Sequence, residues 1–176
     1  IMERAVWKQS LSHCKGLFTL SEYVADWLRQ ATGKKVSALI HPTEIPELLF
    51  DFEQFLFNPD KHIIQVGWWL RRLSAIDKLP MSPDNPLRYK KLRLLPSFFQ
   101  GAPEYLHRMI ERERQRDSAS PDSFPVLERI HVPDAEYDRL LSQNICFIQL
   151  YDASANNTVV ECLARGTPLL VNRLPA

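Results

Sequence analysis

The residues whose types and spacing best suit chemistry lie in one polar segment near the end of the chain. Hydroxyl, amide and carboxylate groups recur there at intervals of three and four residues, at Ser154, Asn157, Thr158, Glu161 and Arg165. On a helix these intervals place the side chains on one face. A buried strand precedes the helix, and ligands of parallel α/β sheets bind beyond the carboxyl ends of the strands. The free N–H groups at the helix start suit a diphosphate, and Glu161, about one turn further on, could accept hydrogen bonds from ribose hydroxyls.

The same residues also fit a structural role. Ser154 would cap the helix, and Asn156 and Asn157 would belong to its first turn. Glu161 and Arg165 would form an ion pair on the surface. Such i,i+4 pairs are common, and spacing alone slightly favours this interpretation. The direction in which the Glu161 carboxylate points therefore decides between the ligand-binding interpretation and the structural one.

The elements that must position this segment alternate between strands and helices, an order typical of a parallel sheet with crossover helices. From Lys61 onward the hydrophobic pattern predicts strands at residues 62–66, 90–95, 126–131, 145–150 and 168–172. Helices are predicted between them at residues 69–76, 103–116, 134–141 and 154–165. Five strands in this order predict an α/β fold with a doubly wound, Rossmann-like parallel sheet.

A shorter run of elements precedes this sheet. Strands are predicted at residues 16–20 and 35–40, with a helix between them that Ser21 caps. The turn at residues 58–60, Asn-Pro-Asp, precedes the regular alternation. We therefore expect residues 1–45 to be the end of a preceding domain together with a connector. Residues 46–176 are expected to form the Rossmann-like domain, truncated at its C-terminus.

Composition and charge exclude several classes of protein. The 176 residues are 45% hydrophobic and 24% charged, which is typical of a globular protein. Because 22 basic residues balance 21 acidic ones, a nucleic-acid partner is not expected. The 3 cysteines form no CxxC pair and the histidines lack metal-ligand spacing, so no metal site is expected. No apolar run has transmembrane length, and the odd cysteine count fits a reducing, cytoplasmic compartment.

Other conspicuous side chains have simpler interpretations. Lys91 and Arg93 belong to a basic run that we interpret as a solvated edge or the beginning of a strand. The mixed charges of residues 111–116 predict a solvated helix face. Of the neighbouring Trp68 and Trp69, we expect one to anchor the core and the other to lie at its rim.

The run from Glu161 to Leu170 resembles the E-A-x-A-x-G-x-P-V signature of the GT-B glycosyltransferases. In that family the glutamate binds the ribose of a nucleotide-diphosphate-sugar donor, and the start of the preceding helix holds its diphosphate. The resemblance therefore implies that Glu161 binds the donor, together with residues at the helix start, Ser154, Asn156, Asn157 and Thr158.

The resemblance continues upstream. Gly67 resembles the strand–Gly–Arg element of the family, with Arg71 and Arg72 standing where basic residues contact the donor phosphates. Residues 18–23 resemble an element late in the acceptor-side domain. The resemblance implies a hexosyltransferase whose donor-binding half is this chain, inactive alone because the catalytic cleft of the family lies between two domains. Arginines and a helix dipole could neutralise the leaving diphosphate, so no metal cofactor is expected.

Two departures from the family pattern leave the chemistry open. Retaining members often carry a second acid eight residues before the ribose glutamate, where this chain has Ala153, with Asp152 one step away. Their Phe-Gly loop is replaced here by residues 154–157. Retention or inversion, the sugar and the acceptor all stay undecided.

Two other functions also stay open. The alanine at position 153 favours a non-catalytic interaction domain that kept a degenerate GT-B fold. The remaining possibility is an unrelated nucleotide-binding Rossmann domain. The first βα turn lacks a GxGxxG motif, which argues against a dinucleotide ligand.

Overall fold

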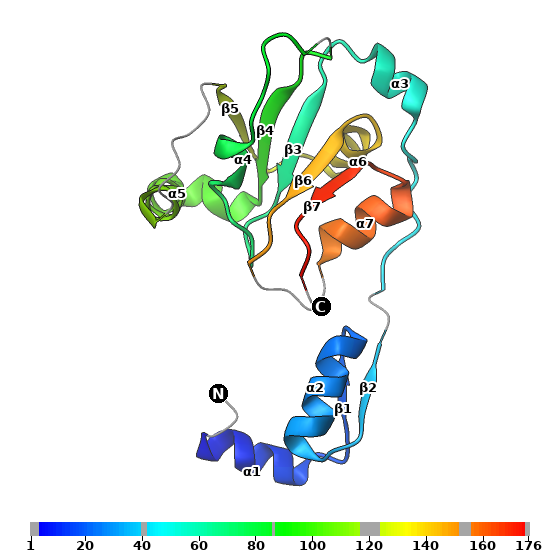
Figure 1. Ribbon diagram of the computed structural model, residues 1–176, viewed down its shortest axis with the longest axis vertical. Coiled ribbons are helices and arrows are strands. Elements are labelled where there is room, and N and C mark those ends of the chain that lie inside the picture. Colours follow the sequence, from blue (N-terminus) through cyan, green and yellow to red (C-terminus); the bar gives the residue numbers. More distant parts are fainter. Residues whose placement is uncertain (1–3, 40–41, 86, 117–123, 152–155, 175–176) are drawn as a thin grey trace. The chain divides into compact units, whose positions relative to one another are not determined.

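The computed structural model describes residues 4–39, 42–85, 87–116, 124–151 and 156–174. Two compact units divide the chain. The first contains the described residues up to Pro42, together with Asn156, and the second contains those of 43–151 and 157–174. Both are drawn in Figure 1, coloured along the sequence.

The first unit is a small parallel pair of strands with two helices. Its elements are α1 (Ala5–His13), β1 (Leu17–Thr19), α2 (Glu22–Thr32) and β2 (Val36–Ala38). The predicted cap is confirmed, because the Ser21 hydroxyl accepts a hydrogen bond of 3.3 Å from the Val24 N–H. Gly33 ends α2 in the left-handed conformation with φ 65°. The unexpected element is α1.

The second unit contains the predicted parallel sheet. Its strands are β3 (His62–Val66), β4 (Lys90–Leu95), β5 (Val126–Ile130), β6 (Ile145–Ile148) and β7 (Leu169–Val171). They lie in the order β5-β4-β3-β6-β7, and each neighbouring pair is parallel. The chain therefore builds outward from β3 in one direction and then in the other. This doubly wound order creates a switch point between β3 and β6, beyond whose carboxyl ends ligands bind in open α/β sheets.

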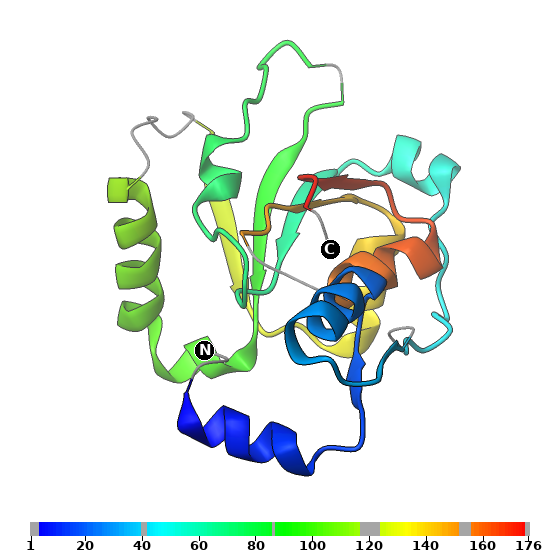
Figure 2. The same cartoon turned by 60° about the horizontal axis from the view of Figure 1, so that its bottom comes forward.

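Helices cover both faces of this sheet (Figures 1 and 2). One face carries α4 (Ala75–Lys78) and α5 (Pro103–Arg116), and the other carries α6 (Asp134–Ser142) and α7 (Asn157–Arg165). Connections between parallel strands of one sheet are right-handed. The helices therefore move to the other face of the sheet once the chain starts to build from β3 in the opposite direction. Two shorter elements, α3 (Phe52–Phe57) and the 3-10 turn η1 (Ser97–Gly101), complete the unit.

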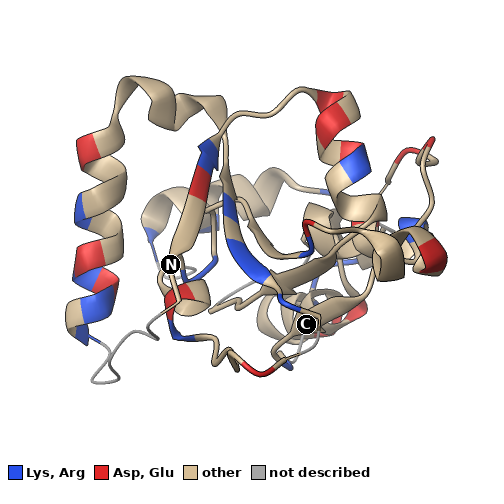
Figure 3. Cartoon of the chain, turned by 90° about the horizontal axis from the view of Figure 1, so that it is seen from above, with Lys and Arg blue, Asp and Glu red and all other residues tan. Residues whose placement is uncertain are grey.

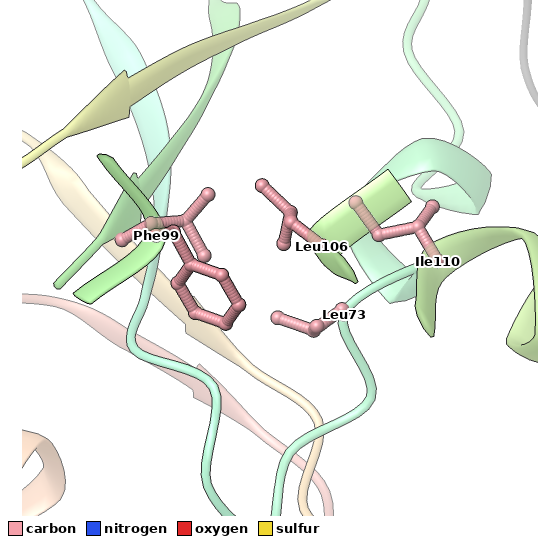
Figure 4. Packing of buried hydrophobic residues seen from close by; sticks show 5 residues of the cluster. Leu73, Phe99, Leu106 and Ile110 are labelled. Atoms are coloured by element: carbon pink, nitrogen blue, oxygen red, sulfur yellow. The ribbon is translucent and has the colours of Figure 1, made fainter. Parts of the chain in front are cut away.

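A cluster of buried side chains joins α5 and η1 to the sheet. Its members are Leu73, Leu95, Phe99, Leu106 and Ile110. Four of these side chains are labelled in Figure 4, where they lie close together. Trp68 packs against this cluster, with its ring centroid 5.5 Å from that of Phe99, whereas Trp69 is 64% exposed. The expected division between a core tryptophan and a rim tryptophan is confirmed.

The prediction that Lys91 and Arg93 lie on a solvated edge is wrong. Their strand, β4, lies between β3 and β5, so both side chains are buried, with 0% and 1% of their surface exposed. Arg93 donates to the Asp77 carboxylate at 2.7 Å, to the Leu73 carbonyl at 2.9 Å and to Glu128. Lys91 donates to the Asp77 carbonyl at 3.1 Å. A charge network thus replaces the hydrophobic side chains expected in a central strand.

The charged face of α5 is solvated only in part. Figure 3 shows basic and acidic residues interspersed along this helix. Two members of the predicted solvated run nevertheless turn toward the sheet. Glu113 accepts a hydrogen bond of 2.8 Å from the Ser74 N–H, and Arg114 pairs with Asp77 at 3.0 Å.

Residues 69–76 also differ from the prediction, because only their last part is helical. Helix α4 begins at Ala75, and the residues before it form turns on either side of an isolated antiparallel bridge between Arg71 and Leu150, just after β6. The Arg72 N–H donates to the Gln149 carbonyl at 2.8 Å, and the Tyr151 N–H donates to the Leu70 carbonyl at 3.2 Å. Partners from a distant strand therefore override the local helical pattern.

Replacing Asp77 with alanine should strongly destabilise the second unit. The change leaves the buried Arg93 without one carboxylate and removes one of the two carboxylate partners of Arg114, the other being Glu111. Breaking a buried ion pair on one side costs about 3–5 kcal/mol. Urea denaturation followed by circular dichroism would measure this loss. The matched control is Asp84→Ala, an exposed loop position, and equal stability of the two variants would contradict the assignment.

Candidate functional site

The candidate site begins at Gly67, the residue that follows β3. Its φ of 74° lies in the left-handed region, and its N–H donates to the Leu94 carbonyl at 2.9 Å. A Cβ built on Gly67 would approach Arg71 Cζ to 2.9 Å. Glycine is thus required twice here, for the backbone conformation and for the close approach of a guanidinium.

Arg71 crosses from the end of β3 to the start of α7. An isolated antiparallel bridge joins Arg71 to Leu150, which aligns the residues after β6 with the turn after β3. The Arg71 guanidinium then donates from Nη2 to the Thr158 hydroxyl at 3.1 Å. Because Thr158 lies in the first turn of α7, the cation and the positive end of the helix dipole meet at one place.

Burial lowers the pKa of Arg71, and attraction to Tyr137, Cys146 and Glu161 opposes that effect. An arginine stays protonated under such conditions because its ordinary pKa is far above neutrality. The site therefore holds a partly desolvated positive charge. Such a charge interacts with an anion more strongly than a solvated arginine does.

Glu161 occupies the same face of α7 as Thr158 and accepts a hydrogen bond from a residue of α6. The Tyr137 hydroxyl donates to Glu161 Oε2 at 2.6 Å. Burial, followed by the nearby Glu161 carboxylate, raises the pKa of Tyr137 far above its usual range. Tyr137 therefore remains a donor at neutral pH, and it fixes the orientation of the second carboxylate oxygen, Oε1.

The structural alternative from the sequence, an ion pair between the Glu161 and Arg165 side chains, is wrong. Both residues belong to the part of the chain that the structure describes, and there the Arg165 guanidinium pairs with Asp138 instead of Glu161. Its Nη1 also reaches the Glu161 backbone carbonyl at 3.4 Å. Only 9% of Arg165 is exposed, so this arginine belongs to the packing of α6 against α7.

Four of the predicted donor-binding residues lie together in this site: Gly67, Arg71, Thr158 and Glu161. Asn157 is the first residue of α7. Arg72 points elsewhere, into a cavity of about 530 Å³ lined by Glu113, Arg116 and Tyr151. Because Arg71 binds Thr158 whereas Arg72 lines this other cavity, the two arginines do not form one clamp.

Ser154, Asp152 and Ala153 fall outside the described residues. Asn156, just before α7, is grouped with the first unit, whereas all four residues of the site belong to the second.

The sequence analysis did not identify Tyr137 as a residue of the site, although the spacing of its neighbours could have indicated that it is buried. Tyr137, Leu140 and Leu141 recur at helical spacing, which places the tyrosine on the buried face of α6. A buried tyrosine hydroxyl needs a hydrogen-bond partner, and the nearest polar stripe in the sequence is that of α7. The pairing with Glu161 itself required the packing of the two helices.

The described residues contain no group of three or more metal-ligating side chains placed to hold an ion. Within the same residues, every helix is too short or too polar to span a bilayer.

Comparison with known proteins adds no family assignment. No model of a protein family matches the sequence. No curated protein matches it significantly. The function must therefore be argued from the site itself.

Replacing Gly67 with alanine should displace Arg71 and strain the turn after β3. A non-glycine residue in a sparsely populated backbone region costs about 1–3 kcal/mol. We expect a lower midpoint of urea denaturation and a changed NMR resonance of the Arg71 Nε–H. Gly101→Ala is the control, because a Cβ there meets nothing within 4 Å and φ is not positive. An unchanged Arg71 resonance in Gly67→Ala would refute the close approach.

Replacing Tyr137 with phenylalanine should leave the Glu161 carboxylate without its hydroxyl donor while keeping the ring. A hydrogen bond to a charged group contributes about 1.5–3 kcal/mol. The free energy of unfolding should fall by a comparable amount, measured by chemical denaturation. Tyr105→Phe, at a side chain that is 42% exposed on α5, should have almost no effect. Equal stability of the two variants would argue against the bond.

Proposed function

We propose that the second unit binds the nucleotide-diphosphate-sugar donor of a GT-B glycosyltransferase. The observation that carries the proposal is the Arg71 guanidinium, held 3.1 Å from Thr158 at the first turn of α7. A fixed cation beside a helix start offers a diphosphate both ionic and backbone hydrogen bonds. The location supports this assignment, since it lies beyond β3 and β6, where the strand order reverses.

The ribose would bind further along the polar face of α7. Thr158 and Glu161 are three residues apart, so the carboxylate follows the phosphate-binding turn by about one helical turn. Because the Tyr137 hydroxyl binds Oε2 of Glu161, Oε1 would be the oxygen that accepts hydrogen bonds from the ribose. A carboxylate that accepts two ribose hydroxyls in this way discriminates a nucleotide from a free pyrophosphate.

The proposed reaction transfers the sugar from the diphosphate to an acceptor oxygen. The bond between the anomeric carbon and the phosphate oxygen breaks, and its electron pair stays on the leaving nucleoside diphosphate. The acceptor oxygen bonds to the same carbon and loses its proton to a base outside this unit. Arg71 and the start of α7 would stabilise the negative charge that develops on the leaving group.

A second candidate, nucleotide binding without transfer, is favoured by the alanine at position 153, where many retaining members have an acid. This candidate needs the same donor site. The two are separated by a transfer assay with radiolabelled nucleotide sugars on the protein with its acceptor-side domain. Binding without any turnover would support the second candidate.

The chain should bind at least one of UDP, GDP and ADP, and two substitutions should weaken that binding. Loss of a charged hydrogen bond costs about 1.5–3 kcal/mol, so Arg71→Gln should raise Kd by roughly ten- to a hundredfold. Glu161→Ala should also raise the Kd for nucleotides but leave that for pyrophosphate unchanged. Isothermal titration calorimetry would measure both.

Matched controls for this titration lie on α5. Arg112→Gln and Glu104→Ala change exposed charges of the same sign and should bind like the parent chain. The proposal would be refuted if the chain bound none of the three nucleotides. Equal loss of affinity in the controls would show that net charge, and not this site, governs binding.

A further inference from the structure

Another cavity lies at the amino ends of β4 and β5, at the opposite end of the strands from the proposed donor site. The loop between α4 and β4 contributes Ser82 and Arg88 to its wall, and the residues that lead into β5 contribute Phe124 and Pro125. The volume of this cavity is about 630 Å³. Pockets for small molecules span about 300–1,000 Å³, so the cavity has the size of a ligand site.

Most of the residues that line this cavity are apolar or aromatic: Pro83, Tyr89, Phe124, Pro125 and Leu127. The Tyr89 ring stacks on the buried Phe55 of α3, with ring centroids 6.2 Å apart and an interplanar angle of 25°, and this contact fixes its orientation. Burial raises the pKa of Tyr89, so its hydroxyl stays neutral at pH 7. An apolar body placed against these side chains would remove apolar surface from water, which favours binding.

The charged residues of the lining are basic. Among its described members are Arg88, Lys90 and Lys91, and none of these members is acidic. Lys91 is fully buried and donates to the Asp77 carbonyl at 3.1 Å, and Lys90 pairs with Asp60. The Arg88 side chain is exposed, and within the described part of the chain it makes no ion pair or side-chain hydrogen bond. An anion that enters the cavity would therefore meet an accessible guanidinium that is not neutralised by a described carboxylate.

The backbone of Arg88 has an unusual conformation. Its φ of 48° lies in the left-handed region, which residues other than glycine seldom adopt. Hydrogen bonds within the loop hold this conformation. The Arg88 N–H donates to the Asn85 carbonyl at 3.0 Å, and Asn85 Oδ1 accepts from the Leu87 N–H at 2.9 Å. Strained backbone of this kind concentrates in segments that bind ligands, and here it determines where the guanidinium begins.

We propose that this cavity binds a small organic anion, namely an aromatic body that carries one carboxylate. The carboxylate accepts two parallel hydrogen bonds from the Arg88 guanidinium, whose planar arrangement of N–H donors matches it. The aromatic body packs against Tyr89, Phe124 and Leu127. The inference does not depend on nucleotide binding, because the two sites lie at opposite ends of the strands.

The test is an NMR titration of the whole chain with naphthoate at pH 7 and constant ionic strength. We expect saturable shifts of the backbone amides of Arg88, Tyr89 and Leu127. Naphthamide has the same rings without the charge and should bind roughly tenfold more weakly, because it loses the charged hydrogen bonds to the guanidinium. Acetate lacks the apolar body and should give no saturable shifts. Absence of saturable shifts at these residues with naphthoate, or equal affinity for naphthamide, would overturn the proposal.

Arg88→Gln tests the anionic half of the site, since position 88 is exposed and glutamine keeps a side chain with a Cβ there. The Kd for naphthoate should rise by roughly tenfold, and the preference over naphthamide should disappear, with an unchanged thermal midpoint. Arg112→Gln removes the same charge from an exposed position of α5 and should bind naphthoate like the parent chain. Equal affinities of the two variants would assign the binding to net charge and refute this site.

Leu127→Ser tests the apolar half. Leu127 is 48% exposed on the edge strand β5, so the substitution should leave the thermal midpoint almost unchanged. It should raise the Kd for naphthoate and for naphthamide alike, by roughly fivefold, because both lose the same apolar contact. Leu163→Ser, at a position of α7 that is 71% exposed, is the matched control and should bind both compounds like the parent chain. Parent-like affinity of Leu127→Ser would contradict the proposed packing.

Discussion

The position of Arg71 depends on hydrogen bonds that hold an irregular segment to the sheet. No helix or strand contains residues 67–74, yet this segment carries the guanidinium of the candidate site. The fully buried Gln65 side chain donates to the Arg72 carbonyl at 2.8 Å and accepts from the Ile76 N–H at 3.2 Å. Arg93 donates to the Leu73 carbonyl from the neighbouring strand. Buried side-chain amides and a guanidinium thus replace the regular hydrogen bonds that this backbone lacks.

The same requirement explains why charges occupy a central strand. Arg93 can reach the Leu73 carbonyl only because Asp77 and Glu128 neutralise it inside the protein. A hydrophobic residue at position 93 would avoid the cost of burying a charge but would leave that carbonyl without its donor. The hydrogen-bond network around Arg93 therefore both stabilises the core and helps to position Arg71. This coupling links the buried side chain of Arg93 in β4 to the geometry of the site.

The sequence predicted the parts of the fold that depend on local pattern. Alternating hydrophobic runs located all five strands of the sheet, and a capping serine located the start of α2, because these signals need no knowledge of partners. Features that depend on distant contacts were missed. The local pattern of residues 69–76 is helical, but hydrogen bonds with the residues after β6 hold most of them in turns around an isolated bridge. Likewise, Tyr137 and Glu161 meet only after α6 packs on α7, and the burial of Lys91 required the order of the strands.

The two ends of the sheet adjoin opposite helix termini. At the carboxyl end α7 begins, and the positive end of its dipole would attract an anion, so the proposed diphosphate site combines one arginine with a helix start. At the amino end α6 finishes, and its last carbonyls carry the negative end of the dipole. Side chains of Ser142, Asn144 and Thr167 donate to three of these carbonyls. The protein's own donors therefore satisfy this end of α6, as buried backbone carbonyls require.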